Sequence, residues 1–135
     1  MSGRGGRSYN RAVRDRILPF AVSFTATCLF FINVCDWIFD CGCRSLWAGA
    51  DAMCNVHLPN VHHCPICSRG IAGYTAVMAA VSAPQLAASV WLPFDKVTRI
   101  VLCLLLFPIG MIAVGGLLGL YDGYWGFVGE WVGPR

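Results

Sequence analysis

Three long apolar stretches constrain the fold of this chain more than any other feature. They cover residues 17–39, 71–94 and 100–121; the second and third contain no charged residue, and the first contains none before Asp36. Each reaches the ~20 residues that a helix needs to cross the hydrocarbon core of a bilayer. Because a segment in lipid must satisfy its backbone hydrogen bonds internally, each stretch is predicted to be a helix. The sequence therefore predicts an all-α membrane protein with three transmembrane helices.

The composition supports lipid as the solvent of this chain. Hydrophobic residues make up 57% of the 135 residues and charged residues only 13%, whereas about a quarter of a soluble domain is charged. The net charge of +3 is small, and no pattern of basic residues interleaved with aromatic ones is present, so nucleic acid is not an expected partner. The expected partners are the lipid bilayer and other membrane-protein subunits.

The distribution of basic residues predicts an orientation. Residues 1–16 form an arm with five arginines, and the link 95–99 contains Lys96 and Arg99. Because Lys and Arg concentrate in cytoplasmic segments, both are predicted to face the cytoplasm. The loop 40–70 and the tail 122–135 then lie together on the outer side. We expect the inner (plasma) membrane of a bacterium, with the loop on its periplasmic face.

Aromatic residues separated by glycines mark the C-terminal tail. They are Tyr121, Tyr124, Trp125, Phe127 and Trp131. Aromatic side chains of this kind settle at the headgroup level of a bilayer. The tail is therefore predicted to lie along the membrane surface, at a position from which it can cover the loop.

Small residues recur every fourth position in the second and third apolar stretches. The second stretch has Ala79, Ala83 and Ala87, and the third has Gly115 and Gly119. Small residues let the backbones of membrane helices approach closely. They can serve packing within the chain or against another subunit, and three helices offer little internal volume, so we favour contact with a partner.

The strongest chemical signal lies in the loop between the first two stretches. Six of the eight cysteines and all three histidines fall between Cys35 and Cys67. Cys54-x-x-His57 and Cys64-x-x-Cys67 are chelating pairs separated by six residues. Together they offer three thiolates and one imidazole, which is a common tetrahedral ligand set for zinc. These four residues are the predicted metal ligands.

The loop contains more ligands than one tetrahedral ion can use. Cys41, Cys43, His62 and His63 are secondary candidates. The surplus allows a second site or an iron–sulfur cluster held by four cysteines, and copper(I) also binds thiolates. A framework of disulfides without any metal is a further alternative, because an outward-facing loop lies in an oxidising compartment.

These features predict a small accessory subunit of a larger membrane complex, one that converts energy or transfers electrons. The metal would stabilise a loop that docks on the partner, and no catalytic residue is assigned. One alternative is a membrane thiol–disulfide oxidoreductase that uses Cys64-x-x-Cys67, since a Cys-Pro-x-Cys motif occurs in such enzymes, where one thiol has a lowered pKa. Another alternative is a metal chaperone or sensor, which would bind its ion reversibly.

Overall fold

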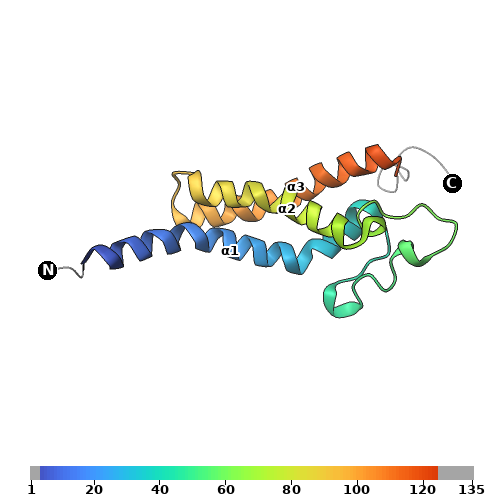
Figure 1. Ribbon diagram of the computed structural model, residues 1–135, viewed down its shortest axis with the longest axis horizontal. Helices are drawn as coiled ribbons and strands as arrows, with labels where there is room; N and C mark the ends of the chain where they lie inside the picture. The colour runs from blue at the N-terminus through green and yellow to red at the C-terminus, as the bar shows by residue number, and fades with distance from the viewer. Residues whose placement is uncertain (1–3, 125–135) are drawn as a thin grey trace.

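The computed structural model describes the backbone of residues 4–124 and the side chains of residues 13–124. Within that range the chain forms three long helices and no strand: α1 (Arg4–Phe39), α2 (Gly70–Trp91) and α3 (Lys96–Asp122) (Figure 1). Three segments are long and apolar enough to cross a membrane, namely Val13–Phe39, Cys67–Trp91 and Lys96–Asp122. The prediction of an all-α fold is confirmed for the described residues, and the three predicted spans are helices long and apolar enough to cross a membrane.

The helix ends follow local signals. α1 begins at Arg4, within the segment predicted as an arm, so the helix extends well before residue 17. α2 ends at Trp91, since Pro93 disfavours a helical conformation at the residue before it. Asp95 caps α3, because its carboxylate accepts hydrogen bonds from the backbone N–H groups of Val97 and Thr98.

The three helices lie alongside one another, and each packs against the other two (Figure 1). The short link between α2 and α3 lies beside α1 at one end of the bundle. The connection between α1 and α2 lies at the other end, together with the C-terminal end of α3. That connection includes three short 3₁₀-helices, η1 (Leu46–Ala48), η2 (Asn55–His57) and η3 (Cys67–Arg69).

A proline at the link end opens the backbone of α1. Pro19 has no N–H, so the helix loses one hydrogen bond at this point. The hydroxyl of Ser89 on α2 bonds to the α1 backbone here: it donates to the Arg16 carbonyl and accepts from the Phe20 N–H at 3.2 Å. A side chain of α2 thus satisfies backbone groups of α1 that would otherwise face lipid.

Two arginines at this end bind the last carbonyl groups of α2. Arg16 donates to the Val90 carbonyl at 3.2 Å, and Arg99 donates to the Ser89 carbonyl at 3.2 Å. Positive charge at the C-terminal end of a helix also complements its dipole. Arg16 of α1 and Arg99 near the start of α3 therefore lie at the same end of the bundle.

A polar pair lies in the bundle interior. Gln85 is fully buried, and its side-chain amide donates to the Thr27 hydroxyl at 3.0 Å. Such interhelical hydrogen bonds join membrane helices, where lipid provides no hydrophobic drive for association. Cys103 is also buried, with its thiol donating to the Gln85 carbonyl at 3.3 Å, whereas Cys28 is exposed on α1.

The glycine pair of α3 packs within the chain. A Cβ atom at Gly115 would come within 3.3 Å of Ile38 and 3.4 Å of Phe39, and one at Gly119 would lie 3.6 Å from Phe39. The two glycines thus let α3 approach the C-terminal end of α1. Our preference for a partner subunit at this glycine pair was wrong: the end of α1 already occupies that face. Ala79 and Ala83 of α2, in contrast, are exposed.

Replacing Gly115 by leucine should destabilise the bundle, because the new side chain would collide with Ile38 and Phe39. Overpacking of this kind costs about 1–3 kcal/mol. Gly116→Leu is the matched control, since nothing lies within 4 Å of a Cβ at that position. Unfolding of the detergent-solubilised variants, followed by circular dichroism, measures the difference. Equal stability of the two variants would contradict the packing described.

Candidate metal centre

The connection between α1 and α2, residues 40–69, is here called the cap. Its fully buried residues are five cysteines with Pro65 and Ile66, and its other residues are half-buried or exposed. The five cysteines are Cys41, Cys43, Cys54, Cys64 and Cys67. Cys35, from the last turns of α1, is buried against them. Most of the buried side chains of the cap are therefore cysteines.

Tight backbone turns bring the first part of the cap back on itself. Gly42 has a φ of +78°, and a Cβ atom there would lie only 2.8 Å from the Met53 carbonyl oxygen. Glycine fits this turn because it lacks a Cβ and tolerates positive φ. The Asn55 N–H then donates to the Cys41 carbonyl at 2.8 Å. These contacts place the segment around Cys54 beside Cys41 and Cys43.

The Asn55 side chain connects this segment to the rest of the cap. Its carbonyl oxygen accepts from the Cys64 N–H at 3.0 Å, and its amide donates to the His62 carbonyl at 3.0 Å and to the Tyr124 hydroxyl at 2.9 Å. The Tyr124 hydroxyl in turn donates to the Phe39 carbonyl at 2.9 Å. Burial raises the pKa of Tyr124 to about 12. One asparagine thus links both halves of the cap to Tyr124, two residues after the end of α3.

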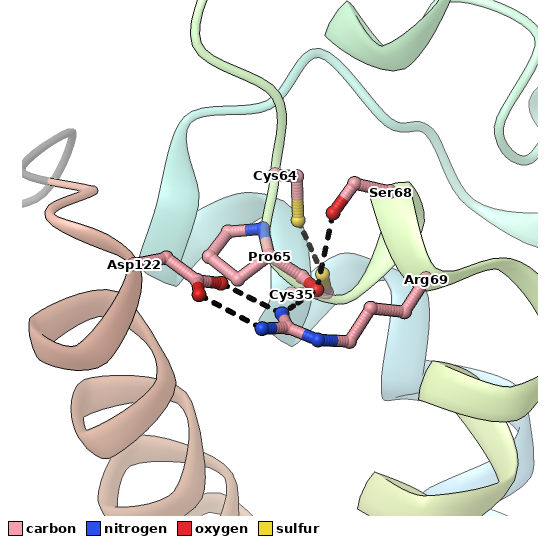
Figure 2. Close-up of polar contacts among 6 residues, drawn as sticks. All are labelled: Cys35, Cys64, Pro65, Ser68, Arg69 and Asp122. Carbon is pink, nitrogen blue, oxygen red and sulfur yellow. Dashed lines mark hydrogen bonds and ion pairs between the residues drawn. The ribbon is translucent and has the colours of Figure 1, made fainter.

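An ion pair fixes the start of α2 to the end of α3. Figure 2 shows the Arg69 guanidinium between the Pro65 carbonyl oxygen, at 2.6 Å, and the Asp122 carboxylate, at 2.6 and 2.8 Å. Both side chains are partly exposed, so the pair adds little stability by itself. Its bidentate geometry nevertheless orients the turn that contains Cys64 and Cys67.

The six sulfur atoms form two compact groups. Within each group all Sγ atoms lie within 4.8 Å of one another. The first group is Cys35, Cys41, Cys64 and Cys67, and the second is Cys41, Cys43, Cys54 and Cys67. The Cys35 and Cys64 sulfurs are 3.7 Å apart (Figure 2), and the Cys43 and Cys67 sulfurs are 3.8 Å apart. A tetrahedron of thiolates with metal–sulfur bonds of about 2.3 Å has edges of about 3.8 Å, so each group can hold one ion.

All eight cysteines of the chain are free thiols in this structure. The 3.7 and 3.8 Å separations far exceed the ~2.05 Å of a disulfide bond. Hydrogen bonds from the Cys35 and Cys43 thiols hold the pKa of Cys41 well below its usual value. Burial raises the pKa of Cys54 to about 11. The neighbouring thiols thus favour the thiolate form of Cys41, which is the form that binds metal.

Three of the four residues in the primary predicted ligand set belong to the cluster, although Cys64 lies in the first group, Cys54 in the second and Cys67 in both; the secondary candidates Cys41 and Cys43 belong to it as well. The structure places the histidines elsewhere, and none belongs to either group of ligands. The rings of His57 and His63 lie at the cap surface, 3.1 Å from the Asp51 carbonyl oxygen and 3.0 Å from the Leu58 carbonyl oxygen. His62 is likewise exposed.

Cys35 joins the site although the spacing argument did not include it. It lies inside α1, six residues before Cys41, and has no chelating partner at two or three residues' distance. The signal that could have found it is its place at the start of the dense run of cysteines, one turn before the helix ends at Phe39.

Replacing Tyr124 by phenylalanine should loosen the cap, because the change removes the hydroxyl that joins Asn55 to the Phe39 carbonyl. Each hydrogen bond of this kind contributes roughly 0.5–1.5 kcal/mol. Tyr121→Phe is the control, since Tyr121 is 84% exposed. Thermal unfolding in detergent should show a lower midpoint for Tyr124→Phe alone. An equal midpoint for both variants would show that the Tyr124 contact contributes nothing.

The rest of the predicted tail, including Trp125, Phe127 and Trp131, lies outside the described residues. Comparison with protein-family models, with curated proteins and with solved structures finds no match to this chain.

Proposed function

We propose that the protein is a small membrane accessory subunit whose cysteine cluster binds zinc as a structural centre. The convergence of six buried thiols in a cap that has almost no other buried side chains supports this proposal most directly. A closed metal site supplies folding free energy to a segment that lacks a sufficient core. The ion would join the end of α1, the cap and the start of α2 into one unit.

Zinc fits these ligands better than the alternatives. It takes four thiolates in a tetrahedron, and both groups match that number and spacing. In a cubane iron–sulfur cluster each cysteine binds a different iron, which spreads the sulfurs farther apart than around a single ion. Copper(I) shares the preference for thiolates, but it commonly uses fewer than four of them.

The cap geometry favours a structural role over the two chemical alternatives. Thiol–disulfide exchange requires an accessible thiolate, whereas Cys64 is fully buried and Cys67 is 8% exposed. A metal chaperone or sensor needs an open path to its ion. Here the two candidate groups are composed entirely of buried residues.

The outer surface of α2 supports the subunit role. An apolar groove of about 330 Å³ is lined by Ala83, Leu86, Ala87, Val90 and Trp91. It contains Ala83, which is exposed, and Ala87, which is half-buried, and their small side chains would allow a helix of another subunit to approach closely. A complex that converts energy or transfers electrons would gain from this chain a rigid cap at one membrane face.

Purified protein should contain stoichiometric zinc, measured by elemental analysis of detergent-solubilised samples. Cys35→Ser should lower the zinc content per chain, because it removes one ligand. Cys28→Ser is the matched control: it changes an exposed cysteine two helical turns earlier in α1. His57→Ala should keep its zinc. Loss of zinc in His57→Ala with full zinc in Cys35→Ser would support the mixed Cys/His set instead, and zinc-free wild-type protein would overturn the proposal.

The orientation of the chain can be measured with reporter fusions in bacteria. We expect the arginine-rich N-terminus in the cytoplasm and the cap in the periplasm, because basic residues collect at the end of the bundle opposite to the cap. Alkaline phosphatase fused after Arg135 should then be active, and green fluorescent protein fused before Met1 should be fluorescent. Inactive phosphatase fused at the same site, in protein present at normal levels, would reverse the topology.

A further inference from the structure

The two groups of four cysteines overlap. Cys41 and Cys67 belong to both, whereas Cys35 and Cys64 belong only to the first group and Cys43 and Cys54 only to the second. The shared thiols are also the central ones: Cys67 interacts with Cys35, Cys41, Cys43 and Cys64, and Cys41 with Cys35, Cys43, Cys64 and Cys67. The six sulfurs thus form two groups of four that share two members, as two tetrahedral sites with a common edge would require.

We propose that this cluster holds two divalent ions, with the Cys41 and Cys67 sulfurs bridging them. The inference rests on the proposed metal centre and states its composition. Each ion would have two terminal thiolates and two bridging ones. Every thiol that binds releases its proton to solvent, and no oxidant or reductant is required.

A single ion leaves the arrangement unexplained. With one ion in the first group, the Cys43 and Cys54 thiols would remain as spectators, although they are 4% and 1% exposed and lie within 4.8 Å of two ligands. With one ion in the second group, the same would hold for Cys35 and Cys64. Moreover, one pair of sulfurs in each group is already as far apart as two thiolates bound to the same ion: the Cys35–Cys64 sulfurs at 3.7 Å and the Cys43–Cys67 sulfurs at 3.8 Å.

The second ion adds no excess charge. One divalent ion with four thiolates has two excess negative charges, and six thiolates around one ion would have four. Adding the second ion binds all six thiolates and returns the excess to two. Because the sulfur cluster is buried, where unpaired charge is costly, it matters that sharing two thiolates lets all six sulfurs bind with the same excess charge as one ion with four thiolates.

The bridges join different parts of the chain. Cys41 follows α1 and Cys67 precedes α2. Each ion therefore has ligands from both sides of the cap. Removing either ion should still leave the two sides joined by the other, so single-site variants remain testable as folded proteins.

Titration of metal-free, detergent-solubilised protein with Co²⁺ tests the stoichiometry. We expect the absorption of tetrahedral cobalt thiolate to rise until two equivalents are bound. The electron paramagnetic resonance signal should grow with the first equivalent and fall with the second, since bridging thiolates couple the two ions. Saturation at one equivalent would overturn the bridged cluster but leave the proposed metal centre intact. No binding at all would overturn both.

Cadmium-113 NMR separates a bridged pair from two independent sites. The protein loaded with ¹¹³Cd²⁺ should give two resonances that split each other through the shared sulfurs. Two resonances without mutual splitting would show separate ions and would overturn the bridging.

Variants provide an independent check on which sulfurs bind which ion. Cys54→Ser and Cys35→Ser should each bind one equivalent of Co²⁺ and lose the coupling, whereas Cys28→Ser should bind two and keep it. Two coupled ions in both Cys54→Ser and Cys35→Ser would contradict the assignment of these residues as terminal ligands.

Discussion

Burying six thiols at one end of a three-helix bundle is the constraint on which the rest of this structure depends. Beyond Pro65 and Ile66, the cap contains no fully buried residue that is not a cysteine. A segment of this size cannot bury enough apolar surface to offset the conformational entropy of ordering its backbone. The tight turns of the cap, the hydrogen bonds of Asn55 and the Arg69–Asp122 ion pair hold the backbone so that the cysteine side chains are buried. Bound metal would turn this collection of weak contacts into a fixed unit.

The bundle is organised differently at its two ends. At the link end, polar side chains of one helix form hydrogen bonds with backbone groups of another. Ser89 bonds to the backbone of α1 next to Pro19, and Arg16 and Arg99 donate to the last carbonyl groups of α2. At the cap end, Gly115 brings α3 against α1 close to Cys35. Lipid contributes no hydrophobic drive between helices, so hydrogen bonds and close backbone approach hold the helices together between these two ends.

The membrane spans could be predicted from the sequence, because the cost of exposing a backbone to lipid depends only on local composition and length. The helix ends were less predictable: α1 starts at Arg4, although its first turn contains Gly5 and Gly6, which have low helix propensity. Spacing found Cys54, Cys64 and Cys67, which lie at or beside tight turns. It missed Cys35, whose proximity to Cys64 arises from packing between residues far apart in the chain.

The histidines and the glycine pair show the limit of reading patterns one segment at a time. Cys54-x-x-His57 has the spacing of a chelating pair, yet in η2 Asn55 bonds within the cap and Val56 packs against the buried core, while the His57 ring lies outside. The glycines of α3 were recognised as a close-packing surface, but a sequence does not state which helix will occupy it. The position of the His57 ring and the packing partner of the glycines both depend on where the chain folds back, and a hydropathy pattern does not predict that.

The length of α2 has a further consequence. Its 22 residues rise about 33 Å at 1.5 Å per residue, close to the ~30 Å hydrocarbon core of a typical bilayer. α1 is longer and can absorb hydrophobic mismatch at its N-terminal end. α2 has no such reserve, because it starts directly after Cys67 and ends at the arginine contacts of the link. A bilayer of different thickness therefore acts on the turn between Cys64 and Cys67 first, which makes the sulfur cluster the part of the protein most directly exposed to membrane thickness.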